Sequence, residues 1–495
     1  MKRIISLFVC LLMLFSMTVF VAAEPNLNNK PEFIENYDGY PIVVVRGFNF
    51  SGMYNKKTGE KAFSISTKTI MKLLSDVFIN SLIFRNENAL ADGIVNFLWD
   101  SMGNFASDDK GNSINSDITI HQCYNAMSED LEFLETVPYK NAEGVLHEVV
   151  DAVGAENVYF LNLDWRLAPW ESAERLNNLV ESAKKNSGKD KVKIICASMG
   201  GAVTTAYLKY YGGKSVDSCT FLSSAHNGAG VAGEALNGTI VIPSESFEYY
   251  FTTMSEYNGN RVLTFILKLL GYTGIYDHLA NVVNNFAEKN LDKIYDEALI
   301  DIFATNPGLW ALCPDELYDG AIENIFSYRS DCPELFEKVM KCREFVFSTE
   351  ETLSEAEKDG VKMTFISNYD SGLLPIYKNS AEQGDRFLEL RLTSGFATVA
   401  NVNEILANDY IEKADKKYIS PDKIIDAGNC LYKDRTWFIK NATHVAADYG
   451  TEYSEFVLLL ALSQEQPTID TFPEYPQFMI SDKSMELQPL KVNGD

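Results

Sequence analysis

The segment Lys191–Gly201, KVKIICASMGG, constrains the fold of this chain most strongly. Its β-branched residues predict a short buried strand. A turn with a single serine, Ser198, comes next, and a helix-prone run, Ala202–Tyr211, follows before Gly212 and Gly213. Strand, sharp turn and helix, in that order, are the context of a nucleophile elbow in an α/β protein.

The residue types around Ser198 suit such a turn. A serine at a strained backbone position needs small neighbours two residues before and two after it. Gly200 meets this need, and Cys196, where glycine is usual, is also small. Met199 would be the first residue of the helix, and the N-terminus of a helix stabilises negative charge. Its backbone N–H could therefore donate to an oxygen that becomes negative during the reaction. Ser198 is therefore the candidate nucleophile and Met199 a candidate oxyanion donor.

Strand-like and helix-like segments alternate over much of the chain, which predicts a doubly wound, mostly parallel α/β sheet. We expect a first core part at 24–227, a helical cap or lid insertion at 228–355, and a second core part at 356–495. The insertion is expected because strand-like runs fade there and helical segments rich in Tyr, Phe, Leu and Asn replace them. The strands are expected at 41–46, 158–162, 192–195, 218–223, 361–366 and 436–439.

The N-terminus predicts export. Residues 1–23 combine Lys2 and Arg3 with a long apolar run and end in Val-Ala-Ala, as a signal peptide does. An uncleaved membrane anchor is the alternative, because the apolar run is long. The formal net charge of −26 argues against nucleic acid as a partner. No cofactor is expected, and no metal, because the cysteines outside the signal are odd in number and contain no close pair.

A serine nucleophile requires a histidine base, and in doubly wound hydrolases that base follows the serine and the acid in the chain. Only five histidines are present. His444 fits this order best, because it follows a strand-like run and precedes an apolar helix. His226 comes too early and is expected beside the pocket. The others precede Ser198 or lie in the insertion: His121, His147 and His278.

The acid is open among three aspartates. Asp370 directly follows a predicted strand, and Asp422 and Asp426 flank a short branched apolar run. A second oxyanion donor is expected from the loop after the first strand, where Gly47 and Phe48 follow PIVVVR.

Three segments resemble the α/β-hydrolase family related to lecithin:cholesterol acyltransferase, which includes phospholipases. Pro41–Phe48 is similar to the family's first strand and oxyanion loop, with Arg46 where proline is usual. Leu163–Leu167, LDWRL, resembles the family's YDWRL signature, and Cys196–Gly201 resembles GHSMGG. The resemblance implies Ser198 as nucleophile and His444 as base. The family's acid lies in a DGxV-type turn, which favours Asp422, although Lys423 stands in place of the glycine.

Together these features predict a secreted serine hydrolase or acyltransferase. It would cleave carboxylic esters through a Ser198–His444–Asp422 triad and an acyl-enzyme. A lipid or other acyl ester is the expected substrate, with transient contact to a membrane or lipid interface. Two alternatives remain: a non-catalytic exported binding protein on the same scaffold, and a thioesterase or peptidase acting on a non-lipid substrate.

Overall fold

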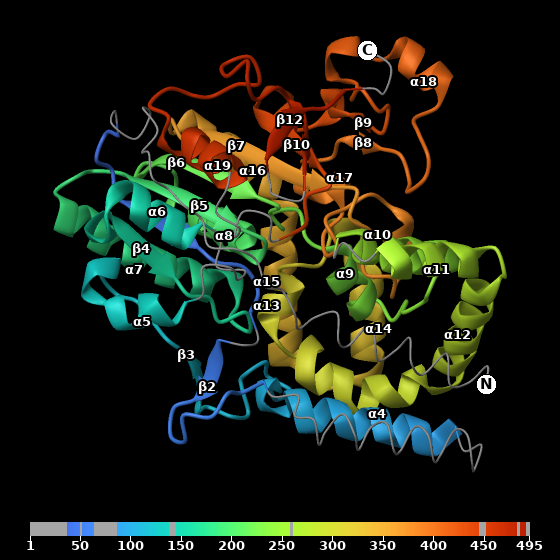
Figure 1. The fold of residues 1–495 in the computed structure, drawn as a ribbon. Coiled ribbons are helices and arrows are strands. Elements are labelled where there is room, and N and C mark those ends of the chain that lie inside the picture. The colour runs from blue at the N-terminus through green and yellow to red at the C-terminus, as the bar shows by residue number, and fades with distance from the viewer. Residues whose placement is uncertain are drawn as a thin grey trace.

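The computed structural model describes residues 37–49, 52–63, 87–137, 145–257, 261–444, 452–482 and 486–491 (Figure 1). The predicted signal peptide, residues 1–23, lies outside the described residues. Within them, no helix is both long enough and apolar enough to cross a membrane.

An eight-stranded sheet forms the centre of the described structure, in the order β12-β11-β10-β7-β6-β5-β1-β4. Neighbouring strands run parallel, except that β12 pairs with β11 in the antiparallel sense. The carboxyl ends of the parallel strands therefore share one edge, where loops can bring distant side chains together. The strands are β1 (Ile42–Val45), β4 (Val158–Leu161), β5 (Val192–Ala197), β6 (Val216–Leu222), β7 (Lys362–Tyr369), β10 (Thr436–Lys440), β11 (Phe478–Ser481) and β12 (Leu487–Pro489).

Helices cover both faces of this sheet. Along β1, Ile42 and Val44 join one hydrophobic core while Val43 and Val45 join the other, as alternation along a strand requires. The first core includes α6 (Leu146–Val153) and α19 (Glu452–Leu462). The second includes α7 (Pro169–Ser187), α8 (Met199–Tyr211) and α16 (Thr349–Lys358). The predicted α/β fold with a mostly parallel sheet is confirmed.

The long connection from β6 to β7 is helical, as the composition of 228–355 predicts. Its last helix, α16, packs on α8 and belongs to the sheet's own core, so the predicted boundary at residue 355 falls inside a core helix. That the remaining helices act as a cap stays a prediction. They are α9 (Gly230–Leu236), α10 (Ser244–Tyr257), α11 (Arg261–Gly271), α12 (Ile275–Ile294), a π-helix η5 (Tyr295–Ala304), α13 (Pro307–Trp310), α14 (Tyr318–Tyr328) and α15 (Pro333–Phe347).

Short elements that the sequence pattern does not reveal complete the fold. Two small antiparallel pairs, β2–β3 and β8–β9, have strands of only two or three residues, too short for a periodic signal. The bounds of these short elements are β2 (Met53–Asn55), β3 (Ile118–Ile120), β8 (Thr398–Val399), β9 (Ile425–Asp426), η3 (Met127–Glu129), α5 (Leu131–Thr136), α17 (Leu390–Thr393), α18 (Asn408–Lys413) and η9 (Ala427–Asn429). A longer helix, α4 (Glu87–Met102), precedes β3.

Candidate active site

Ser198 occupies the turn between β5 and α8, with backbone angles φ 54° and ψ −129°. A positive φ is rare for residues other than glycine and persists only where the surroundings enforce it. Here the Ser198 N–H donates to the Leu222 carbonyl at 3.1 Å, and the Ser198 carbonyl accepts from Gly201 and Ala225. These bonds hold the serine at the carboxyl edge of the sheet, between the ends of β5 and β6.

The need for small residues after Ser198 has a direct geometric cause. A Cβ on Gly200 would lie 2.4 Å from the Val45 carbonyl oxygen, and one on Gly201 would collide with the Ser224 hydroxyl. Cys196 stands where the family motif has glycine. Its side chain is fully buried and packs in the core, and its thiol donates to the Thr220 carbonyl. The tight turn therefore tolerates cysteine where glycine is usual.

The turn after β1 lies against Ser198. A Cβ placed on Gly47 would approach the Ser198 Cβ to 2.6 Å and its Oγ to 3.1 Å. Phe48, the next residue, packs its ring on Trp165 at a centroid distance of 4.9 Å. The backbone of this turn is thus within reach of a group bound at the Ser198 hydroxyl, which is where an oxyanion donor must lie.

Arg46, which stands where the family pattern has proline, also helps to hold the turn after β1 in place. Its side chain is buried, and Nη1 donates to the Asn162 side-chain oxygen at 2.8 Å. On either side of Trp165 in the sequence, Arg166 forms a bidentate ion pair with Asp164 and also donates to the Ile118 carbonyl. These contacts tie the loops at the edge of the sheet to one another.

His444 follows β10, and its ring is paired with Asp385. Nδ1 of His444 lies 2.8 Å from Oδ2 of Asp385, whose side chain is completely buried. The other carboxylate oxygen accepts the backbone N–H groups of Phe387 and Leu388, and the His444 N–H donates to the Asp385 carbonyl. With Nδ1–H directed at the carboxylate, the geometry assigns Nε2 as the basic nitrogen of the neutral ring.

The loop carrying His444 leads away from β10 across the end of β7. Asn368 donates to the Thr443 carbonyl, and the Ser371 hydroxyl donates to the Ala442 carbonyl. Since β7 lies between β10 and β6, this path takes the imidazole along the same sheet edge on which Ser198 stands.

Each of the three aspartates singled out from the sequence has other partners. Asp422 accepts from Lys440, Tyr369 and Ser420. Burial alone would raise the pKa of Asp422, but its hydrogen bonds with Ser420 and Lys440 outweigh burial and hold the pKa below the usual value. The structure places Asp385, not Asp422, at the His444 ring.

The other two aspartates are similarly engaged. Asp370 pairs with Lys440 at 3.4 Å and accepts from the Tyr249 hydroxyl. Asp426 caps η9 through the Gly428 N–H and accepts from Tyr410 at 2.8 Å.

A usable signal for Asp385 exists in the sequence. Asp385-Arg386-Phe387-Leu388 has the same order as Asp422-Lys423-Ile424-Ile425: an acid, one spacer residue and two apolar residues. Both residues that follow the acid have positive φ, 97° at Arg386 and 61° at Lys423, the conformation that favours glycine in a DGxV-type turn. The spacing alone cannot tell the two turns apart.

His226, expected beside the pocket, lies in the core and packs against the stacked rings of Phe221 and Phe365. Nδ1 lies 3.1 Å from the Ser224 hydroxyl. Burial lowers the pKa of His226 to about 4, so the ring is neutral at physiological pH. Its surroundings are those of a packed core histidine.

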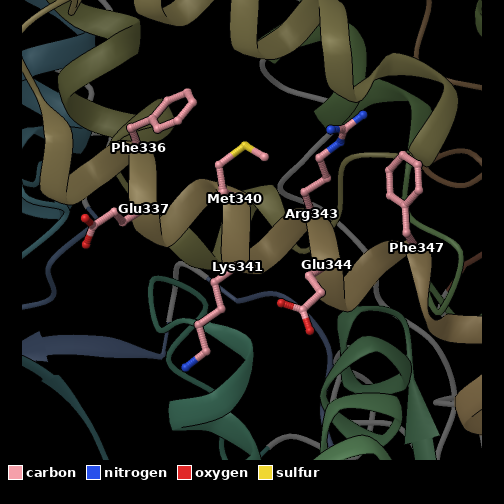
Figure 2. A pocket seen from close by; sticks show the side chains of 7 residues that line it. All are labelled: Phe336, Glu337, Met340, Lys341, Arg343, Glu344 and Phe347. Carbon is pink, nitrogen blue, oxygen red and sulfur yellow. The ribbon is translucent and has the colours of Figure 1, made fainter.

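One surface hollow, of about 720 Å³, lies away from these residues (Figure 2). It is lined by side chains of α15 alone, among them Phe336, Met340 and Phe347, which lie along one side of the helix. None of the candidate active-site residues lines it, so we assign it no part in the chemistry.

Comparison with known proteins adds little. No protein-family model matches the chain, and no curated protein matches it either. Among solved structures, the crystal structure of the Tle4-Tli4 complex aligns with 86% of this chain and 99% of its own, at 9% sequence identity and a TM-score of 0.33. A likeness at that level does not indicate a shared function.

Proposed function

We propose that this protein is a serine hydrolase of carboxylic esters whose triad is Ser198, His444 and Asp385. The observation that carries the proposal is the pairing of His444 with the fully buried Asp385, at the sheet edge where Ser198 adopts its strained turn. Asp385 takes the role that sequence analysis gives to Asp422.

In the proposed mechanism, the Ser198 Oγ forms a bond to the ester carbonyl carbon while its proton moves to Nε2 of His444. Asp385 keeps the ring oriented and stabilises the imidazolium. The N–H groups of Phe48 and Met199 bind the oxygen that becomes negative. The tetrahedral intermediate then breaks its C–O bond to the leaving alcohol, which takes the proton from Nε2. Water, or a second alcohol in a transferase reaction, attacks the acyl-enzyme by the reverse sequence.

The departures from the family motif do not favour the non-catalytic alternative. The side chains of Cys196 and Arg46 are both buried, and they donate hydrogen bonds to the Thr220 carbonyl and to the Asn162 side chain. The backbone features that catalysis needs, a positive φ at the serine and a close glycine turn, are retained.

A lipid substrate is supported by the surface of α11. Val262, Phe265 and Leu269 are 71%, 63% and 49% exposed, and Leu263, Ile266, Leu270 and the following Tyr272 are exposed as well. Exposed apolar surface of this kind is typical of sites that bind other molecules or membranes, and an amphipathic helix can lie in a lipid interface.

The position of α11 links it to the candidate active site. It packs on α10, whose Tyr249 contacts Asp370 and whose Thr253 donates to the Ser371 carbonyl. Ser371 in turn hydrogen-bonds the loop that carries His444. We therefore propose that α10 and α11 bring the active-site edge to a lipid surface. Figure 1 shows α10, α11 and α12 grouped to one side of the sheet.

Hydrolysis of p-nitrophenyl acyl esters tests the proposal. Wild type should release nitrophenol, Ser198→Ala should release it only at the background rate, and Ser187→Ala, at an exposed serine on α7, should behave as wild type. A folded wild-type protein without ester hydrolysis at any acyl length would favour the binding-protein alternative. Activity confined to thioesters or peptides would favour the thioesterase or peptidase alternative.

A further inference from the structure

We propose that His121, Cys123 and Asp130 form a binding site for a transition-metal ion of the Zn²⁺ type. The three residues come from two segments near one edge of the fold. His121 and Cys123 directly follow β3, and Asp130 stands between η3 and α5. This proposal does not depend on the ester hydrolase chemistry.

The three side chains converge. Nε2 of His121 lies 2.7 Å from Oδ2 of Asp130, and the potential ligand atoms of all three residues lie within 4.8 Å of one another. In a tetrahedral zinc site, neighbouring ligand atoms are about 3.3–3.7 Å apart, given metal–ligand bonds of about 2.0–2.3 Å. The His121–Asp130 pair would widen and the Cys123 thiol would move closer, each by roughly 1 Å or less.

The donor set has the chemistry that Zn²⁺ prefers. Imidazole nitrogen, thiolate sulfur and carboxylate oxygen are its usual protein ligands, and three of them leave a fourth position for water. The Cys123 side chain is buried, whereas those of His121 and Asp130 are 38% and 26% exposed. Solvent therefore has access from the histidine and aspartate side. A bound metal would replace the Cys123 thiol proton, which would be released, and a neutral His121 ring that binds through Nε2 would carry its one proton on Nδ1.

The surroundings hold the ligands in place, as ordered second contacts do in metal sites. The His121 ring stacks on Phe133 at a centroid distance of 4.2 Å. The His121 carbonyl accepts from the Asn162 side chain at 3.1 Å, and the same Asn162 accepts from Arg46. A metal at His121 would thus also brace the turn that contains Gly47.

Cys332 provides a comparison, because it is a buried cysteine that lies beside an aspartate outside the proposed metal site. It is as buried as Cys123, each being 8% exposed, and it also lies beside an aspartate, Asp109. Among the described residues, however, Cys332 belongs to no group of three potential metal ligands. Cys332→Ser is therefore a matched control for Cys123→Ser.

Metal titration of the full-length chain, after chelator treatment, tests the site. We expect one Zn²⁺ per chain by calorimetry, and with Co²⁺ a thiolate-to-metal charge-transfer band together with the visible bands of a tetrahedral ion. Cys123→Ser should abolish the charge-transfer band, and His121→Gln or Asp130→Asn should weaken affinity about tenfold or more. Cys332→Ser should retain both signals.

Two results would overturn the proposal. One is the absence of stoichiometric Zn²⁺ binding by folded wild type with its thiols reduced. The other is a charge-transfer band that persists in Cys123→Ser. Circular dichroism of each variant distinguishes loss of ligation from loss of fold, and three separate ligand variants guard against a single unstable one. Because ester hydrolysis is measured separately, failure here leaves the proposed triad untouched.

Discussion

Asp385 is the single side chain on which the proposed chemistry depends most after Ser198 and His444. Replacing it by asparagine would present an amide where the carboxylate now orients Nδ1–H, so the ring would lose its correct tautomer. We expect Asp385→Asn to lower kcat for ester hydrolysis by on the order of 10⁴-fold. Steady-state kinetics on a soluble short-chain ester would measure the effect.

Asp422→Asn is the matched control, because it changes the acid that sequence analysis favours. Its partners are Lys440, Tyr369 and Ser420, so its loss should affect stability and leave kcat within a few-fold of wild type. The reverse ranking of the two variants would return the acid's role to Asp422.

The limits of sequence reasoning at this scale follow from chain geometry. Ser198 could be found because an elbow imposes residue types on its immediate neighbours, and His444 because few histidines exist. Asp385 lies in an irregular loop after β7. The residue pattern of an irregular loop does not predict the path of the chain, so the contact with the imidazole could not be foreseen. The juxtaposition of His121 with Asp130 was missed for the same reason, because a loop and a short helix bring them together.

At the scale of elements, α11 makes the lipid proposal testable. Phe265→Ser combined with Ile266→Ser removes apolar surface that faces solvent, so it should not disturb the fold. Losing the burial of a phenylalanine and an isoleucine at an interface costs about 2 kcal/mol or more. We therefore expect at least about a tenfold loss of activity on long-chain esters in vesicles or emulsions.

The same double variant should leave hydrolysis of a soluble short-chain ester unchanged, because α11 contributes no side chain to the proposed triad. Ile114→Ser is the control for exposed apolar surface as such, since Ile114 is 58% exposed in a different part of the molecule. Equal losses on soluble and dispersed substrates, or equal losses in the control, would contradict a role for α11 at the lipid interface.

Sequence pattern was most informative for long buried strands and for helices with a marked apolar stripe. Six strands of the central sheet, β1, β4, β5, β6, β7 and β10, were predicted close to their observed bounds because β-branched runs enclosed by turns are distinctive. The strands β11 and β12, at one edge of the sheet, were not predicted. The packing of α16 against the sheet was not predicted. A helix that ends a helical insertion and a helix that covers a sheet have the same periodicity in sequence. Only tertiary packing separates the two.

At the scale of the whole molecule, Glu148 should make stability depend on pH. Burial within α6, and to a lesser degree the charge of Asp151, raise the pKa of Glu148 to about 8. Among the described residues, no hydrogen-bond partner reaches its Oε1. A folded-state pKa above the unfolded value means that this group's stabilisation is complete below about pH 4.5 and is lost as the pH rises toward 8.

Urea unfolding at several pH values would measure this effect. Between pH 5 and pH 9, wild type should lose more of its free energy of unfolding than Glu148→Gln, whose side chain does not ionise. Glu174→Gln, on the exposed side of α7, should follow wild type. Parallel pH profiles for wild type and Glu148→Gln would show that Glu148 is not held neutral in the folded protein.

The proposed chemistry requires an activated hydroxyl at Ser198, and mapping a fluorophosphonate adduct by peptide mass spectrometry tests this most directly. We predict a single covalent adduct on Ser198 in folded wild type, abolished by Ser198→Ala and formed far more slowly in Asp385→Asn. A folded wild-type protein that carries no adduct, or carries it on another residue, would contradict the account.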